Sequence, residues 1–113
     1  MRQKKQDTVN GSIWIEKGGV KYFGKGPLQL LELIQQTGSI NEAAKQMELS
    51  YKKAWTIIQR INEVTGKEII ITKSGGNKGG GAQLTPTAID LMRKYEQLVV
   101  KFKLFMEKEG KKQ

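Results

Sequence analysis

The sequence predicts a mainly α-helical fold with a small amount of β structure, of the α+β class. Two observations support this prediction: three helical patterns follow one another over residues 27–64, and a fourth, much longer one covers residues 86–109. Two short segments with strand-like alternation flank the first three helices, at residues 12–23 and 67–85. At 113 residues, the chain is expected to form a single domain, residues 1–113.

Residues 12–23 predict a β-hairpin, because apolar and other side chains alternate on both sides of the turn sequence KGG. The alternation places one set of side chains on each face: Ile13, Ile15, Val20 and Tyr22 against Trp14, Glu16, Lys21 and Phe23. A helix is then expected over residues 27–37, with Pro27 at its first position and Gly38 just past its end.

Residues 39–64 predict two helices joined by a tight turn. Ser39 and Glu42 form a capping-box pattern, in which each side chain would accept from the other's backbone N–H. The short helix that follows carries Ala43 and Ala44, whose small side chains allow a close helix crossing. Ser50 is expected to cap a third helix, which ends near Gly66 and has an inward-facing set of Ala54, Ile57, Ile58, Ile61 and Val64.

Residues 67–85 predict a second hairpin: the β-branched run KEIIITK, the loop SGGNKGG and the returning strand GAQLT. Thr85 and Pro86 then begin the long helix. Its apolar stripe continues far beyond what one small domain can cover, which predicts a homodimer joined through this helix. The side chains expected to form the dimer contact are Ile89, Met92, Tyr95, Val99, Phe102 and Met106.

The charge of the chain is strongly positive and unevenly distributed. Twenty Lys and Arg against eleven Asp and Glu give a net charge of +9. Residues 1–26 carry +4, residues 27–66 are neutral, and the last two segments, 67–84 and 85–113, carry +2 and +3. Such a balance indicates either a polyanionic partner or a solvated basic surface.

The residue types present exclude several classes of chemistry. The chain has no Cys and no His, so disulfides, thiol nucleophiles and His-based acid–base catalysis are excluded, and no metal site or cofactor is expected. No constellation of the remaining polar residues indicates an active site, so we expect a non-enzyme. No secretory signal or membrane span is visible, and we therefore expect a cytoplasmic protein that does not associate with membranes.

The order of the elements indicates double-stranded DNA as the partner. Two short helices with a tight turn are typical of a helix-turn-helix, and a β-hairpin directly after the second helix is the position of the wing in winged folds. Lys and Arg can donate to guanine, Gln can pair with adenine, and wing residues can contact the DNA backbone. The candidate DNA-binding residues are Ser39, Ser50, Tyr51, Lys52, Lys53, Thr56, Gln59, Arg60, Lys73, Ser74, Asn77 and Lys78.

Other interpretations of the same features remain open. Helix pairs with small residues at the crossing also occur in bundles, and the domain could instead be a winged-helix protein-interaction module without specific DNA binding. Structured RNA is a weaker candidate, because a recognition helix reads A-form grooves poorly. A nucleotide-binding loop is disfavoured, since GGNKGGGAQLT lacks the Lys-Ser/Thr of a P-loop and precedes a strand. Trp55 is interpreted mainly as a packing residue, whereas Tyr51 could either bind a phosphate or cover the turn.

From Gly38 onward, the sequence resembles the N-terminal DNA-binding domain of the ModE family, molybdate-responsive bacterial regulators related to LysR-type winged helices. The residues that carry the resemblance are GSI at 38–40, AAK at 43–45, LSYKKAW at 49–55, Ile58, Asn62, Gly66 and GGNKGGGAQLT at 75–85. The resemblance implies a homodimeric transcriptional regulator that reads an inverted-repeat operator of molybdate or molybdoenzyme genes. It places the DNA-reading helix at Ser50–Arg60 and the wing at Ser74–Gly81.

Full-length members of this family bind molybdate in C-terminal domains, whereas this sequence ends after the long helix. Molybdate sensing is therefore not expected of these residues. The expectation is that a separate effector-sensing partner supplies the signal, or that the protein acts through its abundance alone.

Overall fold

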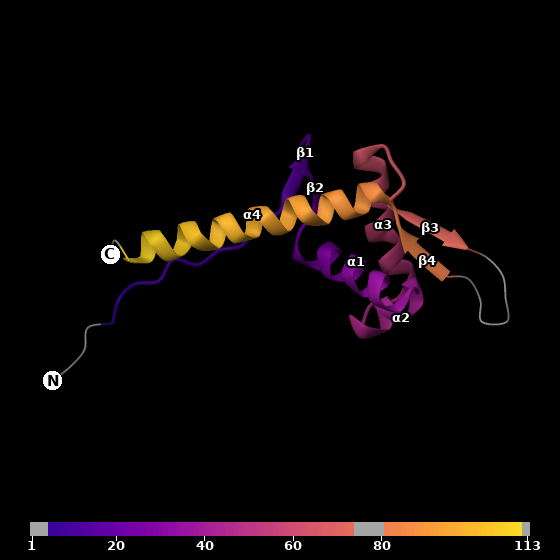
Figure 1. Cartoon of the computed structure of the whole chain (residues 1–113), viewed down its shortest axis with the longest axis horizontal. Helices are drawn as coiled ribbons and strands as arrows, with labels where there is room; N and C mark the ends of the chain where they lie inside the picture. The colour runs from indigo at the N-terminus through magenta and orange to yellow at the C-terminus, as the bar shows by residue number, and fades with distance from the viewer. Residues whose placement is uncertain (1–4, 74–80, 112–113) are drawn as a thin grey trace.

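The computed structural model describes residues 5–73 and 81–111, which form four helices and two small antiparallel sheets (Figure 1). The elements follow in the order β1 (Ile15–Lys17), β2 (Val20–Phe23), α1 (Lys25–Thr37), α2 (Ile40–Gln46), α3 (Tyr51–Thr65), β3 (Ile70–Lys73), β4 (Gly81–Leu84) and α4 (Pro86–Lys111). The predicted class, mainly α with small β, is confirmed.

The first hairpin contains an irregularity that the sequence pattern does not reveal. Lys17 pairs with Val20 around the Gly18–Gly19 turn, but Ile15 pairs with Phe23 instead of Tyr22, because the register shifts after Ile15. The shift turns Phe23 into the core, where it is fully buried. The alternation along β2 does not separate buried from exposed residues, since Tyr22 is partly buried against the core and Val20 is exposed.

Helix α1 begins two residues earlier than predicted. Gly24 is its N-cap and Lys25 its first residue, so Pro27 occupies the third helical position and not the first. Proline is tolerated there, because the N–H groups of the first turn have no intrahelical partner. The helix ends as predicted: Gly38 adopts φ 70° and its N–H donates to the carbonyl of Ile34 at 2.7 Å.

Local capping bonds determine where α2 and α3 begin. The Oγ of Ser39 accepts from the N–H of Glu42 at 3.1 Å, and the Oγ of Ser50 accepts from the N–H of Lys53 at 3.0 Å. The reciprocal half of the predicted capping box is wrong, because the N–H of Ser39 donates to Thr37 Oγ1 at 3.2 Å. The intervening turn includes Glu48, a non-glycine residue at φ 57°.

A single hydrophobic core lies where the three short helices meet both sheets and the first half of α4. Its largest fully buried side chains come from β2, α1, α3 and the residue before β3: Phe23, Leu30, Leu31, Ile34, Ile58, Ile61 and Ile69. Burying a side chain of this size contributes about 1.5–3 kcal/mol, so these positions supply much of the stability that fixes α3 against the rest of the domain.

Polar side chains attach the second hairpin to its neighbours. The Oδ1 of Asn62 accepts from the N–H of Ile69 at 2.9 Å, and the hydroxyl of Thr85 donates to the carbonyl of Glu68 at 2.8 Å. On β4, the N–H of Ala82 donates to the carbonyl of Gly38 at 2.8 Å, which joins the strand to the turn between α1 and α2. These bonds fix the base of the hairpin relative to α2 and α3.

Helix α4 begins in the core and continues well outside it (Figure 1). An extended N-terminal arm, residues 5–14, lies beside the outer half of the helix (Figure 1); Gly11 and Phe102 line one groove between them, and Thr8 and Gly110 line another. The hydroxyl of Tyr95 donates to the carbonyl of Ile13 at 2.9 Å and anchors the inner end of the arm. Within the described ranges, no helix has the length and apolar character needed to cross a membrane.

Candidate nucleic-acid interface

The outer face of α3 displays the polar side chains that the sequence singled out. At about 100° of rotation per residue, positions 52, 56, 59 and 63 lie in one row, and positions 53 and 60 lie beside it. All of these residues are exposed: Lys52, Lys53, Thr56, Gln59, Arg60 and Glu63. The structure therefore brings five of the predicted DNA-binding residues together on one strip, with the acidic Glu63 at its C-terminal end.

The cations of this strip are available to an external anion. Within the described part of the chain, Lys52, Lys53 and Arg60 form no salt bridge, whereas Lys45 on α2 pairs with Glu42 at 3.6 Å. An ammonium or guanidinium group without a protein counterion attracts counterions from solution, and exchanging those for DNA phosphates favours binding. The strip is therefore suited electrostatically to a polyanion.

Three predicted hydroxyl groups already have structural roles. Ser39 and Ser50 cap α2 and α3 through their oxygens, and the Oγ1 of Thr56 donates to the carbonyl of Lys52 at 3.0 Å. The capping oxygens accept, so each serine retains its hydroxyl hydrogen as a donor. Ser39 and Ser50 can therefore cap their helices and also donate to a phosphate, whereas Thr56 can only accept.

The second hairpin lies beside α3 and contributes Lys73, the exposed last residue of β3. The other residues predicted at its tip, Ser74, Asn77 and Lys78, lie outside the described residues. The strands pair in regular register, with Ile70 opposite Leu84 and Lys73 opposite Gly81. Lys73 therefore stands at the end of the paired segment that is farthest from the core.

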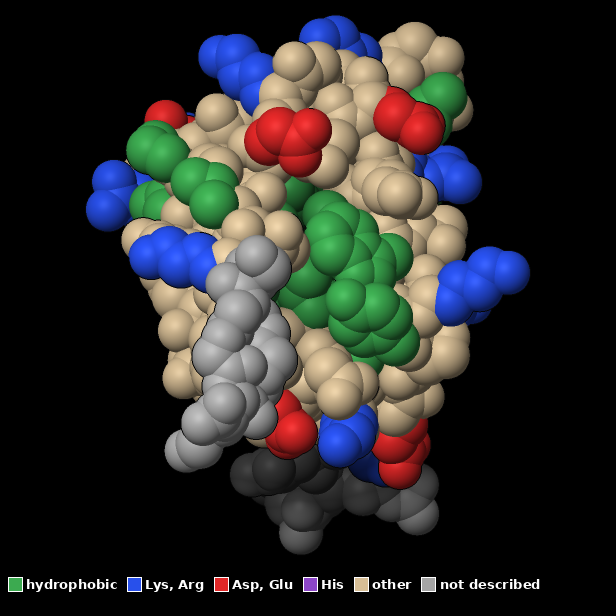
Figure 2. Space-filling model, turned by 90° about the vertical axis from the view of Figure 1, so that its right-hand side faces the viewer, with side chains coloured by type: hydrophobic (Ala, Val, Ile, Leu, Met, Phe, Trp, Pro, Cys, Tyr) green, Lys and Arg blue, Asp and Glu red, His purple; other side chains and the backbone are tan. Residues whose placement is uncertain are grey.

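Between α3 and the hairpin lies a shallow hollow of about 300 Å³ that the sequence did not indicate. Figure 2 shows hydrophobic side chains gathered at the centre of this face of the molecule, with both basic side chains (Lys, Arg) and acidic ones (Asp, Glu) around its margins. The residues that line the hollow come from α3, the hairpin and the start of α2: Ser39, Ile40, Asn41, Tyr51, Trp55, Thr72, Lys73, Gly81 and Ala82.

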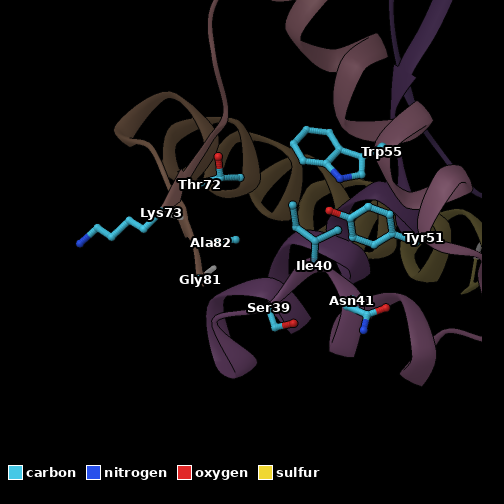
Figure 3. Close-up of a pocket in the computed structure, with 9 residues that line it drawn as sticks. All are labelled: Ser39, Ile40, Asn41, Tyr51, Trp55, Thr72, Lys73, Gly81 and Ala82. Atoms are coloured by element: carbon cyan, nitrogen blue, oxygen red, sulfur yellow. The ribbon is translucent and has the colours of Figure 1, made fainter. Parts of the chain in front are cut away.

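The aromatic pair of α3 forms one wall of this hollow (Figure 3). Tyr51 is 52% exposed, and its ring meets that of Trp55 edge to face, with centroids 6.4 Å apart. Trp55 also packs against the core, which confirms its interpretation as a packing residue. The spacing of Tyr51 and Trp55, four residues apart on a helix, places them on one face, but nothing in the sequence brings the hairpin opposite them.

The residues predicted to form a dimer contact divide into two groups. Met92 and Tyr95 are buried in the core of the chain itself, Ile89 is partly buried against the same core, and Tyr95 packs edge to face on Phe23 at 5.5 Å. Val99, Phe102 and Met106 line a groove in which the N-terminal arm also takes part. The exposed apolar surface of the outer helix also includes Leu98, Val100, Leu104 and Phe105.

No protein-family model matches the chain, but several characterised proteins are similar to it. It is 36% identical over 81 residues to the molybdenum transport protein ModE of Azotobacter vinelandii, a match to 72% of the chain and 30% of that protein. It is 38% identical over 83 residues to the molybdenum-pterin-binding protein MopB of Rhodobacter capsulatus (74% and 30%). It is 37% identical over 71 residues to the DNA-binding transcriptional dual regulator ModE of Escherichia coli (63% and 27%).

These matches indicate a domain related to one in the ModE and MopB proteins. The chain spans less than a third of the length of each of these relatives.

Proposed function

We propose that this domain is a sequence-specific DNA-binding transcriptional regulator built as a winged helix-turn-helix. Helices α2 and α3 form the helix-turn-helix, α3 is the recognition helix, and β3 and β4 form the wing. The observation that carries the proposal is the outer strip of α3, where Lys52, Lys53 and Arg60 have no protein counterion in the described chain and lie beside Gln59.

The chemistry of the strip suits base edges in the major groove of DNA. Arg60 and Lys53 are suited to the O6 and N7 acceptors of guanine, and Gln59 to the N6 and N7 edge of adenine. Ser39, Ser50, Lys52 and the wing residue Lys73 are suited to phosphates, which fix the register of the protein on the duplex. DNA phosphates repel carboxylate side chains. Glu63, at the C-terminal end of the strip, therefore limits the part of α3 that is proposed to contact DNA.

The relatives give the proposal a biological setting. One of them is named as a DNA-binding transcriptional dual regulator and another as a molybdenum transport protein. By extension, we propose that the genes under control serve molybdate uptake or molybdoenzymes.

A homodimer joined through the outer half of α4 completes the proposal. Leu104 and Phe105 are 60% and 55% exposed, and the rings of Phe102 and Phe105 stack with centroids 6.3 Å apart. A cluster of large apolar side chains this exposed on one helix is typical of an interface. Two-fold symmetry would then present two α3 helices to an inverted-repeat operator.

Selection of bound fragments from random DNA, followed by gel-shift titration, tests the proposal. We expect a defined motif and an affinity that falls steeply with salt, by about 0.9 log units per log unit of salt for each phosphate contact. Arg60→Ala and Lys53→Ala should each weaken binding by about 5- to 100-fold, which corresponds to the loss of one base contact. The matched control is Lys108→Ala, which removes an equal charge from the far end of α4.

Two results would contradict the proposal. If neither Arg60→Ala nor Lys53→Ala weakens binding more than Lys108→Ala does, α3 is not the recognition helix. If no motif is selected and the protein does not bind heparin, the domain is better described as a protein-interaction module.

A further inference from the structure

The hollow between α3 and the wing has an apolar floor and polar edges. Ile40 and Ala82 supply the floor and Trp55 the apolar part of one wall, whereas the Tyr51 hydroxyl points into the hollow from that side (Figure 3). On the opposite side, Lys73 extends outward from the wing (Figure 3). None of the described residues that line the hollow is acidic. The surface therefore combines hydrocarbon at its centre with donors around its margin.

The polar groups at the margin have hydrogen-bonding capacity that the described chain does not use. The side chains of Asn41, Tyr51 and Lys73 make no hydrogen bond or ion pair there, and Ser39 retains a hydroxyl hydrogen that its capping bond does not use. Side chains that face solvent around an apolar floor can receive a ligand without breaking any internal contact. A ligand that fits would have an apolar part flanked by anionic groups.

The sugar–phosphate backbone of DNA has this alternating chemistry. Each deoxyribose presents a C–H edge without a hydroxyl at C2′, and an anionic phosphate precedes and follows it. The hollow is also bounded by the two elements proposed to contact DNA, α3 and the wing, so a strand that both elements contact would pass over it. A shallow, open shape suits a continuous chain better than an enclosed small molecule.

We infer that this hollow seats one deoxyribose of the bound DNA strand, with the adjoining phosphates held by Tyr51 and Asn41 on one side and Lys73 on the other. This inference rests on the proposed function and adds a selectivity to it. An RNA strand would place a 2′-hydroxyl against Ile40 and Ala82, whose side chains cannot hydrogen-bond it. An uncompensated hydroxyl in an apolar site is costly, so the hollow should discriminate against a ribonucleotide at this one position.

Single ribonucleotide substitutions along each strand of the selected DNA motif test the inference. Binding should weaken about tenfold at one nucleotide in each half-site and remain nearly unchanged at the other backbone positions. Ala82→Ser places a hydroxyl on the floor of the hollow and should reduce that penalty to about threefold or less. The matched control is Gln83→Ser, whose side chain points to the opposite face of β4.

The possible outcomes are distinguishable. Tight binding to the motif with no ribonucleotide-sensitive position would overturn the inference and leave DNA binding intact. A sensitive position whose penalty is the same in Ala82→Ser and Gln83→Ser would also overturn it, because the sugar would then lie elsewhere. Failure to select any motif would contradict the proposed function first, and this inference with it.

Discussion

Thr85 lies between β4 and α4, and its side chain offers a direct test of what stabilises the junction between the second hairpin and this helix. It is the one buried polar residue among those that the structure describes, at 9% exposure. Its hydroxyl donates to the carbonyl of Glu68 at 2.8 Å and accepts from the N–H of Ala88 at 3.3 Å. Replacing Thr85 by Val keeps the shape of the side chain and removes both bonds.

The expected cost follows from these two contacts. The bond to Glu68 contributes about 1 kcal/mol, and the loss of a helix N-cap costs about another 1 kcal/mol. We therefore expect Thr85→Val to lower the free energy of unfolding by about 2 kcal/mol. Thr85→Ser keeps the hydroxyl and loses one methyl group, which costs about 0.8 kcal/mol.

Urea denaturation followed by far-ultraviolet circular dichroism separates the two variants. With a slope of about 1.5 kcal/mol per M, the midpoint should fall by about 1.3 M for Thr85→Val and by about 0.5 M for Thr85→Ser. All measurements use one protein concentration, because association would make the midpoint depend on it. If Thr85→Val unfolds at the same urea concentration as Thr85→Ser, or later, the two hydrogen bonds do not stabilise the junction.

Three further predictions concern other parts of the chain. Tyr95→Phe removes the 2.9 Å bond to the Ile13 carbonyl and should cost about 1 kcal/mol, with faster chymotryptic cleavage at the neighbouring Trp14; unchanged cleavage would mean that the bond does not hold the arm. Glu48→Gly should raise stability by about 0.5–1 kcal/mol in thermal unfolding, because glycine adopts φ 57° without steric cost; a fall would assign a stabilising contact to the Glu48 side chain. Phe105→Glu should convert the proposed dimer to a monomer in analytical ultracentrifugation, because Phe105 is 55% exposed in the apolar cluster of the outer helix; a dimer that persists would show that this cluster is not the contact.

The sequence was most informative where structure depends on nearby residues. The caps at Ser39, Ser50 and Thr85 each join residues three apart, and Gly38 ends α1 by its own backbone conformation. Predicting these interactions requires no knowledge of the tertiary fold, because both partners lie in the same short segment. The helices and the exposed strip of α3 could also be predicted from local sequence, because helical spacing alone decides which side chains share a face.

Features that depend on contacts between distant segments could not be predicted. The register shift in the first hairpin places Phe23 against Tyr95, which lies 72 residues further along the chain. The polar N-terminal arm has no periodicity to indicate that it lies along α4. The hollow beside Trp55 needs β4 next to the turn before α2, where the Ala82–Gly38 bond joins residues 44 apart in the chain.

The uninterrupted course of α4 has a consequence for how target sites could diverge. No proline or glycine occurs between residues 87 and 109, so the helix behaves as a stiff rod of about 39 Å. A single residue inserted after the core-packed Tyr95 would turn everything beyond it by about 100° and lengthen the rod by about 1.5 Å. In the proposed dimer, such an insertion would change the separation and angular phase of the two half-sites, while α3 itself would still recognise the same bases.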